Sequence, residues 1–166
     1  VRAGMLEAKG DLVGFVDADL AANPIDFKDL LDEPGVRDGK AILIGIRLLT
    51  HERKVKRIFA RHLMGRIFQT LASNATGLRC YDSQCGFKLM SQPRARELAG
   101  HMNCEGFCFD VEILMIVDRL GMKIIEKPIA WEEKGESRIR LGHIITMFFD
   151  IWRIRKRVDR QFPRGA

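Results

Sequence analysis

The sequence predicts an α/β domain in which a mainly parallel sheet is flanked by helices. Three observations predict this class. The 166 residues are 46% hydrophobic and 30% charged, which is typical of a packed globular domain and excludes a disordered chain. Residues 1–46 alternate helix, strand, helix, strand, the order expected of α/β folds. The two strands in this stretch are short apolar runs, as expected of strands covered on both faces.

The chain opens inside a helical pattern. Val1, Met5 and Ala8 recur at the spacing of one helix face, and Gly10 follows as a glycine does just past a helix end. Because the pattern is already under way at residue 1, we expect the chain to be a fragment that lacks an N-terminal part. The alternative is a trimmed form of a complete domain.

Two strands and one helix follow. Residues 12–16 (LVGFV) are predicted to form a buried strand. Asn23 as the cap and Pro24 in the first turn begin a helix over residues 24–32. Residues 41–46 (AILIGI) form the second buried strand.

The second half of the chain continues in the same way. Apolar spacing and the positions of glycine, proline and serine define its elements. These are a helix over residues 54–72, a strand over 87–90, helices over 91–100 and 107–120, a strand over 123–129, a polar loop over 131–138 and a last helix over 141–158.

Two carboxylates stand directly after the first strand. Asp17 and Asp19 lie at its carboxyl end, where open α/β sheets bind their ligands. Mg²⁺ and Mn²⁺ are commonly held by one or two carboxylates together with water and phosphate oxygens. The sequence therefore predicts a divalent metal site there. The alternative interpretation is two solvated acids at a strand end.

Residues 10–20 (GDLVGFVDADL) resemble the Asp-x-Asp segment of the family 2 glycosyltransferases of the GT-A fold. Further segments resemble one branch, the polyprenyl-phosphate or dolichyl-phosphate glucosyl- and mannosyltransferases. Residues 82–88 (DSQCGFK) are most similar to the glucosyltransferases of this branch. The other segments are residues 45–47, 107–112, 126–131 and 137–138.

The resemblance implies inverting transfer of a hexose from a nucleotide sugar, UDP-glucose or GDP-mannose, to polyprenyl (dolichyl) phosphate. It implies that residues 1–138 are a partial GT-A domain without the N-terminal nucleotide-binding strands, inactive as an isolated fragment, and that residues 139–166 are a C-terminal amphipathic basic helix. Ala21 departs from the mannosyltransferases, which often have a glutamine there. That departure argues against mannose and leaves glucose or another sugar open.

The candidate site residues follow from this chemistry and this resemblance. Asp17 and Asp19 would hold Mg²⁺ or Mn²⁺, and a cradle of cations with a serine would hold the anionic groups together. The cradle residues are Arg47, Lys88, Lys134, Ser137 and Arg138. The candidate catalytic or sugar-positioning residues are Asp82, Gln84, Asp110 and Glu112. For the last two, the alternative is stabilisation of a helix start by negative charge.

Two predicted helices have the composition of helices that lie on a membrane surface. The helices at residues 54–72 and 141–158 combine aliphatic and aromatic side chains with many Lys and Arg residues. We expect peripheral contact with an anionic membrane surface on the cytoplasmic side, without spanning. In the last helix the apolar residues expected to face the membrane are Ile144, Ile145, Phe148, Phe149, Ile151, Trp152 and Ile154.

Two other functions compete with this one. The net charge of +6 and the basic helices also suit a nucleic-acid-binding module, although no motif of such proteins is found, and we expect no nucleic acid as a partner. A non-catalytic scaffold derived from the same fold is the second. The nucleotide, the lipid length and the oligomeric state are not determined by the sequence.

Overall fold

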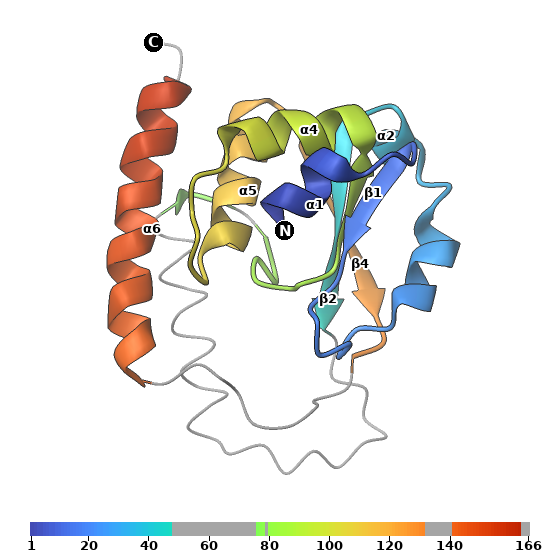
Figure 1. The fold of residues 1–166 in the computed structure, drawn as a ribbon, viewed down its shortest axis with the longest axis horizontal. Coiled ribbons are helices and arrows are strands. Elements are labelled where there is room, and N and C mark those ends of the chain that lie inside the picture. The colour runs from blue at the N-terminus through green and yellow to red at the C-terminus, as the bar shows by residue number, and fades with distance from the viewer. Residues whose placement is uncertain (48–75, 79, 132–140, 164–166) are drawn as a thin grey trace.

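A computed structural model describes residues 1–47, 76–78, 80–131 and 141–163. Its centre is a four-stranded sheet in the order β1-β3-β2-β4 (Figure 1). The strands are β1 (Leu12–Phe15), β2 (Ala41–Arg47), β3 (Lys88–Ser91) and β4 (Lys123–Ile129). The α/β class predicted from the sequence is confirmed.

The sheet is mixed because one strand is reversed. β2 pairs in parallel with β4 from Ala41 opposite Lys123 to Arg47 opposite Ile129. β3 lies antiparallel between β1 and β2. Three of the four strands therefore point the same way, and their carboxyl ends share one edge of the sheet.

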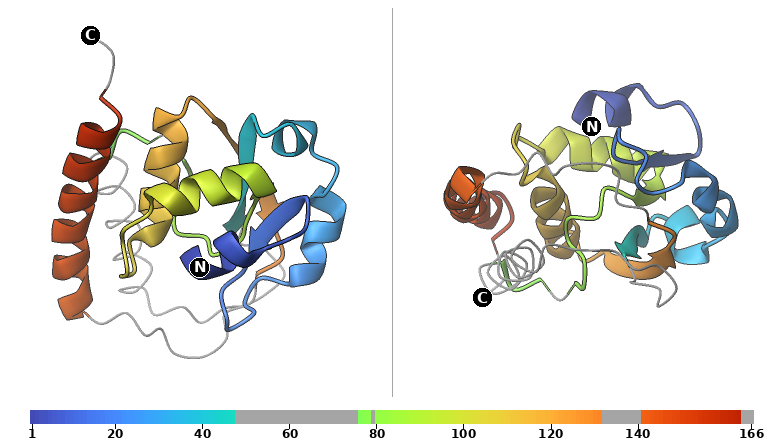
Figure 2. Two further views of the ribbon diagram at one scale, coloured as in Figure 1. Left: turned by 45° about the horizontal axis from the view of Figure 1, so that its top comes forward. Right: turned by 90° about the horizontal axis from the view of Figure 1, so that it is seen from below.

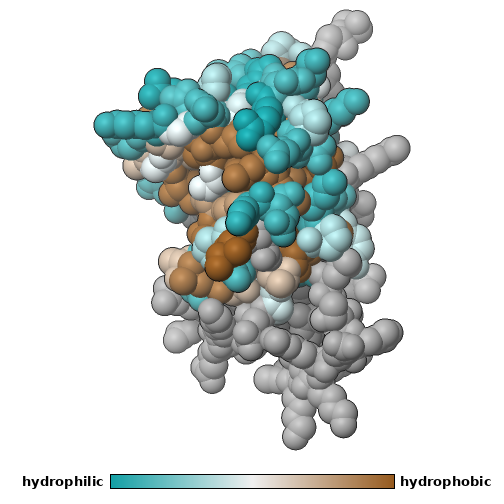
Figure 3. All heavy atoms as spheres, turned by 90° about the vertical axis from the view of Figure 1, so that its right-hand side faces the viewer, coloured by the Kyte–Doolittle hydropathy of each residue, from teal (hydrophilic) through white to brown (hydrophobic). Residues whose placement is uncertain are grey.

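Helices cover both faces of this sheet (Figure 2). One face packs against α1 (Arg2–Glu7), α4 (Gln92–His101) and α5 (Phe109–Arg119). The other packs against the 3₁₀-helix η1 (Pro24–Leu30) and the short helix α2 (Pro34–Arg37). The face seen from the η1 side carries an apolar area bordered by polar side chains (Figure 3).

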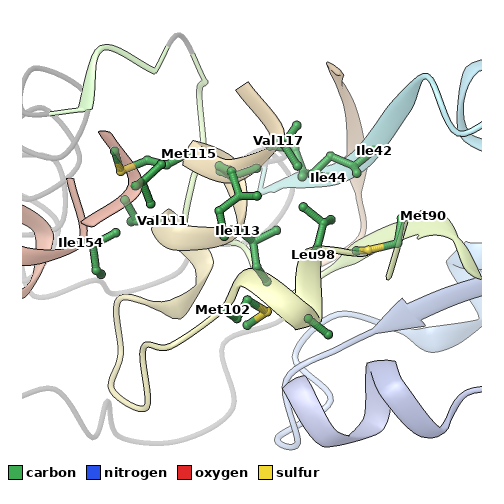
Figure 4. Close-up of a cluster of buried hydrophobic side chains, with 14 of the residues drawn as sticks. Ile42, Ile44, Met90, Leu98, Met102, Val111, Ile113, Met115, Val117 and Ile154 are labelled. Carbon is green, nitrogen blue, oxygen red and sulfur yellow. The ribbon is translucent and has the colours of Figure 1, made fainter. Parts of the chain in front are cut away.

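The side chains of β2 alternate between two apolar cores. Ile42 and Ile44 join Met90, Leu98 and Ile113 in the larger core beneath α4 and α5 (Figure 4). Leu43 belongs to the smaller core beneath η1 and α2. Because β2 is buried on both faces, its sequence is a continuous apolar run instead of an alternating one.

One local prediction differs from the structure. The helix expected over residues 24–32 is a 3₁₀-helix, although the Asn23 side chain caps it as expected by accepting a hydrogen bond from Ile25 N (3.0 Å). It ends at Leu30, and the separate helix α2 begins at Pro34, because a proline is tolerated in the first turn of a helix. The helix expected at residues 54–72 and the loop at 132–138 lie outside the described residues.

The last helix, α6 (Leu141–Gln161), packs along α5. Met147, Ile151, Ile154 and Val158 form a stripe at helical spacing that is buried in the larger core. The expectation that Ile151 and Ile154 face a membrane is therefore wrong. The side chains of residues 141–145, which include Ile144 and Ile145, lie outside the described part.

The aromatic residues of α6 behave differently. Phe148, Phe149 and Trp152 keep 46%, 55% and 53% of their surface exposed. Within the part of the chain that the structure describes, no helix combines the length and apolar character needed to cross a bilayer.

Candidate active site

The two acids that follow β1 lie in a tight turn. Leu20 N donates to the Asp17 carbonyl (3.0 Å), and Ala21 N donates to the Asp19 carboxylate (2.9 Å). Leu20 adopts a φ of 53°, a left-handed conformation that is uncommon for a residue with a branched side chain. The turn is tied to the end of β4 by the bridge between Ala22 and Trp131.

The carboxylate of Asp17 lies directly above a glycine. A Cβ atom at Gly86 would be 2.1 Å from Asp17 Cγ and 2.2 Å from each carboxylate oxygen, which is far inside van der Waals contact. The absence of a side chain at Gly86 is therefore what allows the Asp17 carboxylate to occupy its position. Gly86 belongs to the loop that precedes β3.

Gly86→Ala tests this contact. The added methyl group must push the Asp17 carboxylate aside, and since that side chain is short and movable we expect the fold to survive. The sugar transfer that the resemblance implies for the full-length protein is expected to fall about 100-fold, as displacement of reacting groups by about an ångström commonly does. Gly100→Ala is the matched control, because a Cβ there meets nothing within 4 Å. Unchanged transfer in Gly86→Ala would contradict a role for the Asp17 position.

A buried ion pair lies behind the acids. Lys88, the first residue of β3, is 0% exposed, and its Nζ donates to Asp110 Oδ1 (2.5 Å) and to the carbonyl of Cys85 (2.7 Å). Burial raises the pKa of the Asp110 carboxyl, and the charge and hydrogen bond of Lys88 offset only part of this effect. The ammonium group of Lys88, a predicted phosphate ligand, is enclosed by these partners.

A second ion pair closes the edge of the site. Arg47, the last residue of β2, contacts Asp82 through two hydrogen bonds, Nε to Oδ2 (2.6 Å) and Nη2 to Oδ1 (2.7 Å). Its guanidinium lies 5.7 Å from the ring centre of Trp131. Burial opposes the charged form of Arg47, but the hydrogen bonds and charge of Asp82 outweigh it and raise the pKa of Arg47. Both carboxylate oxygens of Asp82 are thereby engaged.

The electrostatics join these groups into one cluster. Burial, and then the charge of Asp19, raise the pKa of the Asp17 carboxyl above its ordinary value, while Lys88 and Arg47 lower it. The Asp17 carboxylate therefore interacts electrostatically with Asp19, Lys88 and Arg47. The Asp17 and Asp19 carboxylates repel each other, and a divalent cation bound between them would relieve this repulsion. The two residues therefore fit such an ion.

Glu112 is not part of this cluster. Its carboxylate is 0% exposed and accepts hydrogen bonds from Asn103 N (3.0 Å) and Cys104 N (2.8 Å), and it forms an ion pair with Arg157. This set of contacts suits a structural role, and the catalytic role of Glu112 stays a prediction. Gln84 is half-buried in the loop before β3.

Two features of the site, Glu126 and the Gly86 contact, were not predicted from the sequence. Glu126 in β4 accepts a hydrogen bond from Tyr81 N (2.6 Å) and so fixes the start of the loop that carries Asp82. The Gly86 contact was also missed, although a glycine in the middle of a matching segment signals close approach. The predicted phosphate ligands Lys134, Ser137 and Arg138 lie outside the described residues.

The chain was compared with known proteins. No protein-family model matches it. Two dolichyl-phosphate beta-glucosyltransferases of Trichomonas vaginalis are 33% and 36% identical to it, each over 93% of this chain and 47% and 48% of the relative. That of Saccharomyces cerevisiae is 35% identical over 86% of this chain and 46% of the relative. The chain thus spans about half the length of the curated relatives it matches.

By these similarities the chain is homologous to about half the length of proteins named dolichyl-phosphate beta-glucosyltransferases. Its α/β fold and the acidic turn at the sheet edge agree with this similarity. The resemblance found in its sequence segments is confirmed.

Proposed function

We propose that the full-length protein transfers glucose from a nucleotide sugar to dolichyl phosphate, with inversion. One observation carries this proposal: Asp17 and Asp19 lie beside two cationic side chains at the carboxyl edge of the sheet, in a chain homologous to enzymes named for this reaction. Nothing in the comparisons favours a nucleic-acid-binding module.

The sugar is proposed from the relatives. Those named above are called glucosyltransferases, and none of their names mentions mannose. The Ala21 side chain, buried beside the acidic turn, has no atom that could bind a metal. Glucose, with UDP as the nucleotide, is therefore proposed over mannose and GDP.

The metal site is proposed at the acidic turn. Asp17 and Asp19 would hold Mg²⁺ or Mn²⁺, which when bound supplies positive charge against the diphosphate leaving group. Asp17 is kept in place by Gly86, and Asp19 is oriented by the Ala21 amide. Lys88 and Asp110 support the turn from behind, and Lys88 has a positioning role instead of direct phosphate contact.

The acceptor end is proposed to be a cationic cradle. Asp82 holds the guanidinium of Arg47 in a fixed orientation at the end of β2, where an anionic group can approach it. Lys134, Ser137 and Arg138 remain the proposed further ligands of the acceptor phosphate. A phosphate monoester has a second pKa of about 6 and is largely dianionic at neutral pH, so its attack on the sugar requires no strong general base.

A membrane-contact surface is proposed on α6. The exposed aromatic side chains Phe148, Phe149 and Trp152 lie on the side of the helix away from its buried stripe. Lys156 places its ammonium 3.7 Å from the ring centre of Trp152, and Arg153 is largely exposed nearby. Aromatic rings beside cations suit the headgroup layer of an anionic membrane, where the lipid acceptor would reside.

Phe149→Ala combined with Trp152→Ala tests this surface. Removing two exposed aromatic rings is expected to weaken sedimentation of the full-length protein with vesicles of anionic lipid by about tenfold or more. Ile154→Val is the control, since it removes one methyl group from the buried face of the same helix. Equal vesicle binding by the double variant and the control would overturn the proposed surface.

The reaction itself is tested by assaying the full-length protein with dolichyl phosphate and either UDP-glucose or GDP-mannose. The proposal expects transfer from UDP-glucose, its loss on chelation of divalent cations, and its recovery with Mn²⁺ or Mg²⁺. Transfer only from GDP-mannose would overturn the sugar assignment. Full transfer in the presence of the chelator would overturn the metal site, and no transfer from either donor would favour a non-catalytic scaffold.

A further inference from the structure

Two buried carboxylates stand at the start of α5 and serve different neighbours. Asp110 and Glu112 are two residues apart, which places them about 200° apart around the helix axis. Asp110 meets Lys88 on the sheet side, and Glu112 meets Arg157 of α6. The first turn of α5 is therefore tied at the same time to the acidic cluster and to the terminal helix.

The contacts of Glu112 hold the first turn of α5 to the segment before it and to α6. Its oxygens accept from the backbone amides of Asn103 and Cys104, in the segment that leads into α5, while Arg157 approaches from α6. A second link between the start of α5 and α6 is the Cys108 thiol at the helix N-cap, which lies 3.5 Å from the Met147 carbonyl of α6. These contacts fix where the first turn of α5 begins and how it is rotated.

The rotation of this turn determines the position of Asp110. Asp110 Oδ1 binds Lys88 Nζ, and the same ammonium binds the Cys85 carbonyl next to Gly86. Gly86 in turn supports the carboxylate of Asp17. A series of contacts thus runs from Arg157 to Glu112 and from Asp110 through Lys88 to the loop under Asp17, and the first turn of α5 joins its two parts.

From this series we infer that Glu112 and Arg157 are positioning residues for the Asp17 site. Their ion pair holds the first turn of α5 so that Asp110 and Lys88 keep the Cys85-Gly86 loop beneath Asp17. The inference rests on the proposed function for its catalytic consequence, but the structural coupling is independent of it. It also links the seating of α6 to the geometry of the acidic cluster.

A matched control lies on the same two helices. Arg119, the last residue of α5, binds Asp159 of α6 (2.6 Å) and is almost fully buried. This pair joins α5 to α6 as the Glu112–Arg157 pair does, but it lies at the far end of α5 from Asp110. Asp159→Asn therefore removes an inter-helix ion pair without touching the first turn of α5.

The experiment compares Glu112→Gln, Arg157→Gln and Asp159→Asn in the full-length protein. Hydrogen exchange is measured for peptides covering residues 82–88 and 103–110, and transfer is measured as kcat, KM and the Mn²⁺ concentration for half-maximal rate. Arg157→Gln is included because it removes the α6 side of the same pair, while the Glu112 carboxylate keeps its hydrogen bonds from the amides of Asn103 and Cys104.

Both Glu112→Gln and Arg157→Gln are expected to accelerate exchange in the two peptides. They should also lower kcat or raise the half-maximal Mn²⁺ concentration about 10- to 100-fold, as changes behind a metal site commonly do. Asp159→Asn should leave both readouts near wild type. Arg157→Gln with unchanged exchange at residues 82–88, or Asp159→Asn with the same effects as Glu112→Gln, would overturn the inference. Absence of transfer in the wild type would count against the proposed function alone, because the exchange data would still decide the coupling.

Discussion

Asp17→Asn in the full-length protein is expected to lower sugar transfer by about 100- to 1,000-fold. Asparagine keeps the shape of the side chain but removes the charge that would hold a cation against the leaving diphosphate, and loss of one preorganised electrostatic contact commonly has an effect of this size. The measurement is kcat with UDP-glucose and dolichyl phosphate at saturating Mn²⁺. Asp19→Asn is expected to act in the same direction.

The same substitution should not weaken the fold. The pKa of the Asp17 carboxyl is raised, chiefly by burial and then by Asp19, so its ionised form is less favourable in the folded protein than in the unfolded chain. An acid whose pKa is higher in the folded state than in the unfolded state contributes stability at pH values below its pKa in the unfolded state. This contribution is lost as the pH rises through its pKa in the folded state. Removing the charge should therefore leave the thermal unfolding temperature at neutral pH unchanged or raise it slightly. An active Asp17→Asn variant would contradict the proposed role and favour a scaffold.

Lys88→Met is expected to lower the free energy of unfolding by about 3–5 kcal/mol. The substitution leaves the Asp110 carboxylate buried without its cation, and breaking a buried pair on one side has a cost of this order. Lys88→Met combined with Asp110→Asn should recover part of the loss, because no uncompensated charge remains. Thermal or urea unfolding of the two variants measures the difference.

The pH dependence of Lys88→Met gives an internal control. Asp110 already has a raised pKa, and loss of the Lys88 charge should raise it further. The deficit in stability should then shrink as the pH is lowered and Asp110 takes up a proton, and grow as the pH rises through the folded pKa. A deficit that is constant with pH would mean that lost packing, and not the unpaired carboxylate, causes it.

The sequence was sufficient for the class of fold and for the position of the acidic turn. The apolar runs of β1 and β2 are bounded by polar residues, so both strands and the acids that follow β1 could be located from composition and spacing. The reversed direction of β3 could not be predicted, because it depends on how the long connection after β2 returns to the sheet. Nothing in the four residues of β3 specifies the direction of the strand.

Side-chain partners were harder to predict than elements. Lys88 was interpreted as a phosphate ligand because the chemistry needs a cradle of positive charge, yet its place inside the apolar segment 87–90 is itself a sign of burial. Its partner Asp110 is 22 residues away on another helix, and no local pattern pairs the two. On α6 the aromatic and aliphatic residues were treated as one face, although the spacing of Met147, Ile151, Ile154 and Val158 separates a buried stripe from the exposed rings.

The central claim is that Asp17 and Asp19 bind a divalent cation together with a nucleoside diphosphate. Electron paramagnetic resonance of Mn²⁺, titrated with the full-length protein and UDP, measures this binding without any turnover. We predict that the wild type and Asp11→Asn, which changes an exposed acid at the opposite end of β1, remove the free Mn²⁺ signal equally, and that Asp17→Asn binds at least about tenfold more weakly. Equal Mn²⁺ binding by all three proteins would contradict the account.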